Sequence, residues 1–196
     1  MILASANAGK LAELSTLLAP LGFELAPQRL LGIESPPETG TTFLANALLK
    51  ARYAAGERGL PALADDSGIE VDALDNAPGV RSARYAGEGA ADEENLQKLL
   101  FELRAVPESG RRARYRCVIA FVRDADDPAP LIAQGSWEGR IAAEARGAGG
   151  FGYDPIFVPA GERRTAAELT ATEKNAVSHR AQALRALVAQ LRATDA

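Results

Sequence analysis

The chain has 196 residues, 47% hydrophobic and 24% charged, which suits a globular domain with a sizeable core and shows no sign of disorder. Its net charge of −4 disfavours a nucleic-acid polymer as partner but leaves a free nucleotide open. A single cysteine, Cys117, excludes an intrachain disulfide, and one cysteine with one histidine disfavours a zinc site. Because we find neither a run of about 18 apolar residues nor a signal-peptide pattern, we expect a cytoplasmic protein without a membrane partner.

The first part of the chain predicts a strand, a loop and two helices. Residues 1–4 form a short apolar run, and leucines at helical spacing then predict a helix that ends at Pro20. Residues 23–40 are predicted to be irregular because prolines and glycines interrupt them. Thr41 or Thr42 is a suitable N-cap for a second helix over residues 42–56.

An acidic segment follows in the middle of the chain. A buried strand over residues 61–64 leads into Asp65-Asp66-Ser67-Gly68, and residues 69–73 alternate as a further strand. Asp92 is predicted to cap a third helix, since acidic residues favour a helix N-terminus. The acidic segment is therefore expected to separate two strands.

The last part of the chain predicts an antiparallel pair of strands. Residues 113–123 form the clearest strand, and residues 131–137 pair back on it. A short strand at 156–158 and a helix over 179–192 follow. Together these elements favour an α/β protein with a mixed, twisted sheet and flanking helices.

The loop between the first strand and the first helix is a candidate phosphate site. Backbone N–H groups and the partial positive charge of a helix N-terminus favour anions there, and Lys10 adds a cation. The pattern is not a P-loop, so an ordinary turn with a solvated lysine is the alternative. The candidate residues are Ser5, Ala6, Asn7, Ala8, Gly9 and Lys10.

The adjacent carboxylates Asp65 and Asp66 are a candidate Mg²⁺ site. Two aspartates directly after an apolar strand are costly to bury unless a cation compensates them, and Mg²⁺ prefers carboxylate and phosphate oxygens. Successive strand residues point to opposite faces, so one aspartate is expected to face the metal and the other to assist. Gly68 allows a close backbone approach. A surface turn uses the same residue types and stays open as an alternative.

Two residues before and within the second helix are candidates to complete that site. Glu38 is a possible second metal ligand, and Lys50 is positioned to face phosphates. Each has a plain alternative as a solvated surface residue.

The glycine-rich segment Phe151-Gly152-Tyr153-Asp154 is a candidate base-binding site. An aromatic ring flanked by glycines suits stacking on a base, and a carboxylate suits hydrogen bonds to base or ribose. A turn with core aromatics is the alternative.

The segment from Glu173 to Arg180 is a candidate anion contact. Ser178 is a good N-cap, which puts His179 and Arg180 in the first turn of the last helix. Cations are unfavourable there unless an anion is near, although a structural, hydrogen-bonded histidine is the alternative.

Taken in order, these segments resemble the inosine/xanthosine triphosphate pyrophosphatase family. The resemblance runs from Ile2 to about Leu191 and departs only at Ser5, where the family often has threonine. The motifs are Ser-x-Asn-x-x-Lys at 5–10, Glu-Thr-Gly at 38–40, Ala-Asp-Asp-Ser-Gly at 64–68, the Pro-Gly and Ala-Arg-Tyr segment at 78–85, Gly-Phe-Gly-Tyr-Asp-Pro at 150–155 and Glu-Lys-x-x-x-Ser-His-Arg at 173–180.

The resemblance implies a fold and a reaction. The fold is a single elongated domain over residues 1–196, with two lobes, a central cleft and a homodimeric assembly. The reaction is Mg²⁺-dependent hydrolysis of ITP, dITP and XTP, in preference to ATP and GTP, to the monophosphate and pyrophosphate.

The resemblance also implies roles for the candidate residues. Glu38 and Asp66 would bind Mg²⁺, and Asp66 would accept the proton of the attacking water, with Asp65 beside it. The triphosphate would be held by Ser5, Asn7 and Lys10, and Ser67 would touch the substrate. The base would be embraced by Phe151, Gly152, Tyr153 and Asp154, and its edge and the phosphates would be contacted by Lys174, His179 and Arg180.

Two other functions fit the same residues. One is a nucleotide sensor that binds without catalysis, which the pair Asp65 and Asp66 disfavours. The other is a house-cleaning enzyme for modified pyrimidine nucleotides, which shares a similar fold.

Overall fold

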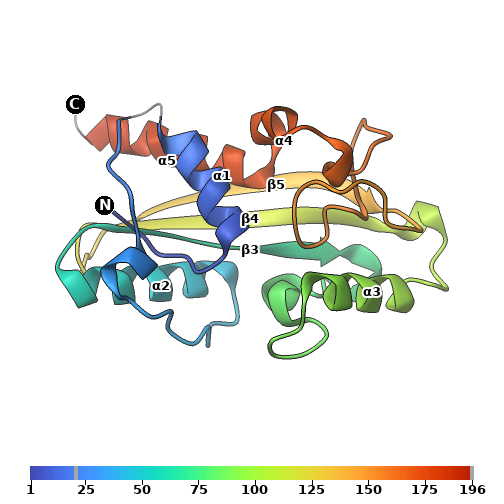
Figure 1. The fold of residues 1–196 in the computed structure, drawn as a ribbon, viewed down its shortest axis with the longest axis horizontal. Helices are drawn as coiled ribbons and strands as arrows, with labels where there is room; N and C mark the ends of the chain where they lie inside the picture. The colour runs from blue at the N-terminus through green and yellow to red at the C-terminus, as the bar shows by residue number, and fades with distance from the viewer. Residues whose placement is uncertain (20–21, 195–196) are drawn as a thin grey trace. The chain divides into compact units, whose positions relative to one another are not determined.

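The computed structural model describes residues 1–19 and 22–194, so Pro20, the predicted end of the first helix, lies outside the described residues. A six-stranded sheet runs in the order β2-β1-β3-β4-β5-β6 (Figure 1). Strand β1 is parallel to β2 and β3, whereas β6 is antiparallel to β5, which confirms the mixed α/β sheet. The strands are β1 (Ile2–Leu3), β2 (Ala26–Pro27), β3 (Ala62–Val71), β4 (Arg112–Val122), β5 (Leu131–Ile141) and β6 (Phe157–Pro159).

The helices begin at side-chain caps that the sequence supplies. Asn7 accepts the backbone N–H of Lys10 at 3.0 Å, and Thr42 accepts that of Ala45 at 3.1 Å. The α-helices are α1 (Ala8–Leu18), α2 (Phe43–Arg58), α3 (Asp92–Glu102), α4 (Ala171–Val177) and α5 (His179–Thr194). Short 3-10 helices are η2 (Gln28–Leu31), η3 (Asp72–Leu74), η4 (Gly79–Arg84), η5 (Glu108–Gly110) and η6 (Ala166–Glu168).

Two local predictions were wrong. The stretch 23–40, predicted to be irregular, contains β2 and η2. The segment before the last helix, for which no element was predicted, contains α4. The N-cap of α3 is Ala91 rather than Asp92. Short elements of this kind lack a long hydrophobic period, so only their packing partners reveal them.

The acidic segment lies within a strand, so the expected break between two strands was also wrong. Strand β3 is continuous from Ala62 to Val71. At Gly68, a Cβ would lie 2.3 Å from the carbonyl oxygen of Gly79 and 2.4 Å from the hydroxyl of Ser82. Glycine is therefore needed for chain packing there, and the Ser82 hydroxyl also accepts the N–H of Ile69 at 2.9 Å.

The chain divides into two compact units. Unit 1 comprises Met1–Asp66, Cys117–Gly135 and Arg180–Ala196, and unit 2 comprises Ser67–Arg116 and Ser136–His179. Each unit has its own hydrophobic core.

In unit 1 the sheet is covered on both faces, by α2 on one and by α1 and α5 on the other (Figure 1). The core under α2 includes Ala47, Ala51, Ala62 and Ala64. The core under α1 and α5 includes Leu3, Leu14, Leu63 and Leu187. Residues 62–64 of β3 therefore alternate between the two cores, as a strand requires.

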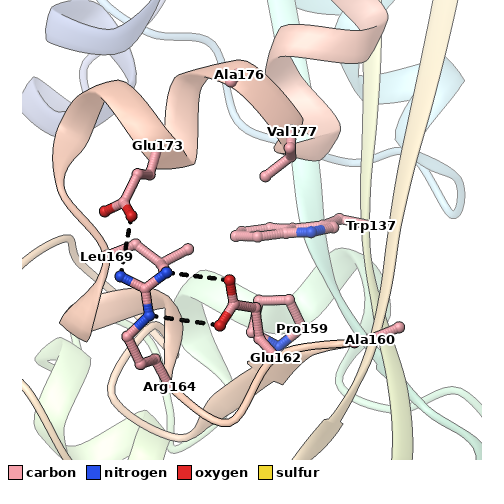
Figure 2. Close-up of a pocket in the computed structure, with 10 residues that line it drawn as sticks. Trp137, Pro159, Ala160, Glu162, Arg164, Leu169, Glu173, Ala176 and Val177 are labelled. Carbon is pink, nitrogen blue, oxygen red and sulfur yellow. Dashed lines mark hydrogen bonds and ion pairs between the residues drawn. The ribbon is translucent and has the colours of Figure 1, made fainter.

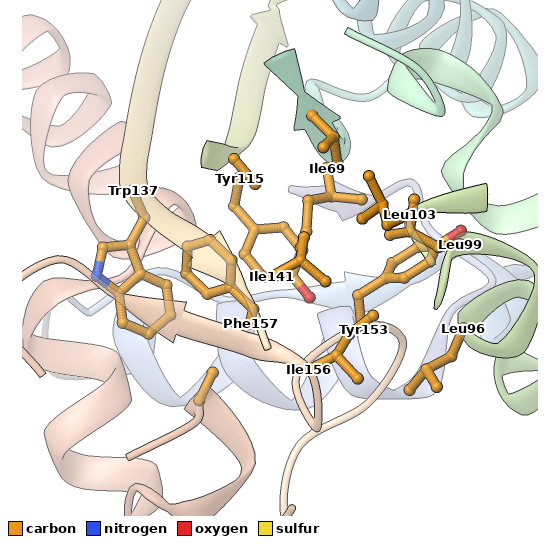
Figure 3. Close-up of a cluster of buried hydrophobic side chains, with 13 residues drawn as sticks. Ile69, Leu96, Leu99, Leu103, Tyr115, Trp137, Ile141, Tyr153, Ile156 and Phe157 are labelled. Carbon is orange, nitrogen blue, oxygen red and sulfur yellow. The ribbon is translucent and has the colours of Figure 1, made fainter. Parts of the chain in front are cut away.

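The core of unit 2 is built on α3 and a group of aromatic rings (Figure 3). Tyr115 and Phe157 meet edge to face, with ring centroids 4.7 Å apart, and the ring centroids of Trp137 and Phe157 are 5.3 Å apart.

Nowhere in the described ranges does a helix combine the length and apolar character needed to cross a membrane.

Candidate functional site

Asp65 and Asp66 lie on opposite faces of β3 because they continue its alternation. Leu63 belongs to the core under α1 and α5, and Asp65 shares that face; Ala64 belongs to the core under α2, and Asp66 shares that one. Both carboxylates are buried. The two adjacent aspartates therefore meet different partners.

Asp65 is held by two cations in unit 1. Its Oδ2 lies 3.1 Å from the Lys10 ammonium and 3.4 Å from the guanidinium of Arg180, which also pairs with Glu13. Burial opposes ionisation, but the charges of Lys10 and Arg180 outweigh it and hold the pKa of Asp65 well below its usual range. Asp65 is thus a carboxylate that stays ionised and paired.

Asp66 faces a second carboxylate across one lysine. The Lys50 ammonium donates to Glu38 Oε1 at 2.7 Å and to Asp66 Oδ1 at 3.3 Å, and Asn46 Nδ2 donates to Asp66 Oδ2 at 3.1 Å. Burial raises the pKa of Asp66 and the charge of Glu38 adds to the rise, although Lys50 opposes both. This group carries two acidic side chains for one basic side chain.

The Lys50 ammonium shows that Glu38 and Asp66 converge on a cation. Both carboxylates lie within 3.3 Å of the same nitrogen. In the part of the chain that the structure describes, no three His, Cys, Asp or Glu side chains gather as a metal site by themselves. Two carboxylates, completed by water and phosphate oxygens, are the donor set that Mg²⁺ usually takes, so these residues fit the ion.

The predicted phosphate loop lies beside a pocket in unit 1. A pocket of about 440 Å³ is bordered by the N-terminal end of α1 and by η2 with its following loop; its lining includes Ser5, Ala6, Ala8, Gln28 and Ser35. Ser5 is buried and its hydroxyl accepts the N–H of Asn7 at 3.3 Å. The Asn7 side-chain oxygen caps α1, so part of its hydrogen-bonding capacity serves the helix.

Asp154 organises the predicted base-binding segment of unit 2. Its Oδ2 accepts from the Lys174 ammonium at 2.5 Å and from the N–H of Phe151 at 2.9 Å. The Tyr115 hydroxyl donates to Oδ1 at 3.2 Å. The Lys174 nitrogen also lies 4.9 Å from the centre of the Phe151 ring. The structure thus brings Phe151, Asp154 and Lys174 together.

His179 belongs to the same cluster through Tyr115. The two rings stack with centroids 4.7 Å apart and an angle of 7° between their planes. Gly150 has φ of +73°, and a Cβ there would lie 2.1 Å from Asp154 Oδ2, so only glycine fits beside the carboxylate.

Other predicted residues of unit 2 lie apart from that cluster or serve packing. Tyr153 is buried in the core of unit 2 and donates its hydroxyl to the Ser82 carbonyl at 2.8 Å, which favours the core-aromatic alternative for this ring (Figure 3). Gly152 N–H donates to Asp92 at 2.7 Å, and Ser67 is half-buried in β3. Their contacts with substrate stay predictions.

Three residues of these clusters were missed. Asn46 lies four residues before Lys50 on α2, so helical spacing offered a signal. Glu13 lies three residues after Lys10 on α1 in the same way. Tyr115 offered none, since a tyrosine in an alternating strand indicates core.

A further pocket of unit 2 contains none of the predicted site residues. Its volume is about 440 Å³, and Trp137, Leu169 and Val177 form its apolar part (Figure 2). Arg164 beside it pairs with Glu162 and Glu173, each at 3.0 Å. One arginine therefore faces two glutamates, which leaves the charged side chains of this pocket with an excess of one negative charge.

The whole chain is similar to proteins of one family. A model of the Ham1 family matches residues 1–190. The dITP/XTP pyrophosphatase of Shigella flexneri is 56% identical over 192 residues, 98% of each chain. The dITP/XTP pyrophosphatase of Escherichia coli strain K12 is 54% identical over the same share of both chains.

Solved structures agree with this similarity. A HAM1 protein from Coxiella burnetii superposes with a TM-score of 0.90 at 53% identity, covering 100% of this chain and 98% of that one. The Ham1 protein of Staphylococcus aureus gives 0.85 at 38% identity, covering 98% of both chains. The similarity therefore extends over both units.

Proposed function

The chain belongs to the Ham1 family, and from this premise we propose that it hydrolyses dITP, XTP and ITP to the monophosphate and pyrophosphate. It is a nucleoside triphosphate pyrophosphatase, a hydrolase that acts on an acid anhydride. The observation that carries the proposal is that Glu38 and Asp66 converge on one cation, the Lys50 ammonium.

The metal proposal assigns Mg²⁺ to Glu38 and Asp66. When bound, the ion supplies neutralisation of phosphate charge and a site for water. Lys50, which reaches both carboxylates, is the side chain that would turn to the phosphates. Burial lowers the pKa of Lys50, but the charges of Asp66, Asp65 and Glu38 outweigh it and raise that pKa. The Lys50 ammonium therefore keeps its charge at neutral pH.

We propose Asp66, rather than Asp65, as the base. Asp66 would accept a proton as the water oxygen bonds to phosphorus and the anhydride bond breaks, so that pyrophosphate leaves. Asp66 shares its one lysine with Glu38, so it is less neutralised by cations than Asp65 and better suited to hold that proton. Asp65, ionised and paired with Lys10 and Arg180, would position those cations.

Each unit contains its own set of proposed recognition residues. In unit 1, Ser5, Asn7 and Lys10 would hold the triphosphate, and Arg180, which pairs with Asp65, belongs with this phosphate set rather than with the base edge. In unit 2, Phe151, Lys174 and His179 would receive the base.

Selectivity follows from donors that face the purine edge. A lysine or histidine donor pairs with a keto oxygen, whereas the amino group of adenine leaves it unpaired, at a cost of about 1–3 kcal/mol for each donor.

We extend the proposal to a homodimer in the cytoplasm. The family resemblance supports the dimer, and the buried free thiol of Cys117 is compatible with a reducing compartment.

Pyrophosphate release tests the proposal. The purified protein with Mg²⁺ should release pyrophosphate from dITP, XTP and ITP at least about tenfold faster, in kcat/KM, than from ATP, since one unpaired donor alone is worth that ratio. Release that needs no divalent ion would refute the metal proposal. Binding of ITP without turnover would favour the sensor, and faster turnover of modified pyrimidine triphosphates would favour the pyrimidine enzyme.

A further inference from the structure

Asn46 is a buried amide at the centre of the acidic group. It is 0% exposed, and it lies in the first turns of α2, four residues before Lys50. Residues at this spacing share one face of a helix, so Asn46 and Lys50 face Asp66 together. No role described above requires an amide here.

The two ends of the Asn46 amide contact two different segments. Its Nδ2 donates to Asp66 Oδ2 at 3.1 Å, and its Oδ1 accepts the N–H of Gly40 at 2.8 Å. A carboxylate requires a donor and an N–H requires an acceptor, so only one orientation of the amide satisfies both. Asn46 thereby links strand β3 to the loop that carries Glu38, two residues before Gly40.

The contact with Gly40 is close. A Cβ at Gly40 would lie 2.5 Å from the Asn46 side-chain oxygen and 2.8 Å from Ala45 Cβ. The loop therefore rests directly on the first turn of α2, and its height above the helix depends on Asn46.

We propose that Asn46 is a positioning residue that sets the separation of Glu38 and Asp66 and so the affinity of this carboxylate pair for Mg²⁺. The inference rests on the proposed function, since it concerns the same two ligands. Partners that hold a metal ligand in place commonly change metal affinity by about 10–100-fold when they are removed. Asn46 acts through Asp66 and the Gly40 loop and need not touch the substrate.

A purely structural role is the competing explanation, and Asn95 provides a matched control. Asn95 is 2% exposed on α3 of unit 2, and its amide likewise accepts the N–H of Ala86 at 2.7 Å and donates to the Ala83 carbonyl at 3.3 Å. It therefore has a similar burial and hydrogen-bonding pattern without a carboxylate partner. Loss of either amide removes two hydrogen bonds of a buried side chain.

The experiment compares Asn46→Leu, Gly40→Ala and Asn95→Leu in the full chain. Binding of Mn²⁺ without nucleotide is measured by the electron paramagnetic resonance signal of the free ion, and thermal unfolding is recorded for each variant. Asn46→Leu and Gly40→Ala should weaken Mn²⁺ binding about tenfold or more, whereas Asn95→Leu should lower the melting temperature at unchanged Mn²⁺ affinity. The Mg²⁺ concentration for half-maximal activity should rise in parallel in the first two variants.

The outcomes separate this inference from the proposed function. Wild-type Mn²⁺ affinity in a folded Asn46→Leu variant, with an active wild-type enzyme, would overturn the role of Asn46 alone. If Asn46→Leu does not fold, Gly40→Ala decides, because it disturbs the same contact from the loop side. A third outcome is that Asn46→Leu weakens Mn²⁺ binding while the wild-type protein hydrolyses none of the triphosphates. That outcome would retain the inference about Asn46 and overturn the proposed function.

Discussion

Each unit contains a buried lysine that meets a buried aspartate, and the two pairs differ in charge balance. In unit 2, Lys174 and Asp154 lie 2.5 Å apart, and the remaining donors on the carboxylate are Tyr115 and a backbone N–H. In unit 1, Lys50 is shared between Asp66 at 3.3 Å and Glu38 at 2.7 Å. The first group is balanced, whereas the second has an excess of negative charge.

This difference shows why the same two residue types serve different purposes. A balanced pair with hydrogen bonds on both oxygens shapes the chain around it, as the close approach at Gly150 indicates. A buried group with surplus negative charge favours a further cation or a proton, and the raised pKa of Asp66 expresses that demand. Charge balance, rather than the presence of an aspartate, separates the candidate catalytic group from the candidate recognition group.

The largest effect should follow Asp66→Asn. Removal of the proposed base and proposed metal ligand should lower pyrophosphate release from dITP by about 10²–10⁴-fold, with the melting temperature within a few degrees of wild type. Pyrophosphate detection and thermal unfolding measure both quantities. The exposed Asp126→Asn serves as control, and turnover of Asp66→Asn at the wild-type rate would remove Asp66 from the mechanism.

The next effect should follow Lys174→Met and should appear in stability. This change leaves Asp154 buried beside fewer donors, so the free energy of unfolding should fall by about 3 kcal/mol. Urea denaturation measures it. The matched change is Lys98→Met, which removes the pair between the exposed Lys98 and the half-buried Glu102 at 3.3 Å and should cost less than about 1 kcal/mol. Equal decreases in the free energy of unfolding for the two variants would contradict a structural role for the pair of Lys174 and Asp154.

A smaller effect should follow Glu38→Gln. This change removes one negative charge from the group of Glu38, Lys50 and Asp66 and nearly keeps the shape of the side chain. The apparent dissociation constant for Mn²⁺ should rise at least about tenfold, because even indirect partners of metal ligands contribute that much. Calorimetric titration of the two proteins provides the measurement. An unchanged constant would show that Glu38 is a plain surface residue, the alternative that the sequence left open.

The smallest effect concerns Cys117 in the interior of unit 1. Burial, with the charge of Asp65 adding to it, raises the pKa of the Cys117 thiol to about 12. Because the thiolate forms only as the pH approaches that value, about one thiol in 10⁴ is ionised at pH 8. Iodoacetamide at pH 8 should leave the native protein unmodified and should modify the urea-unfolded chain, as mass spectrometry can show. Rapid modification of the native protein would mean that the interior beside Asp65 is open to solvent.

Sequence reasoning found the residue types of the site but not their pairings. Lys10, Lys50, Asp65 and Asp66 were all predicted, yet only the fold shows that Lys10 pairs with Asp65 and that Lys50 joins Asp66 to Glu38. The period of a strand required that the two aspartates face opposite sides, but it could not say which helix covers which face. Asn46 was missed although its helical spacing from Lys50 offered a signal, because its partner Asp66 lies on another element.

The amino-acid sequence by itself determined the alternation of strands and helices, the family and the chemistry of the candidate groups, because periodicity, caps and motif spacing are local properties. The tertiary structure decided the continuity of β3 through the acidic segment and the separate environments of Asp65 and Asp66. It also placed Tyr153 in the core and Arg180 beside Asp65. These features depend on burial and on charges brought together from distant segments, and both arise only when the helices pack on the sheet.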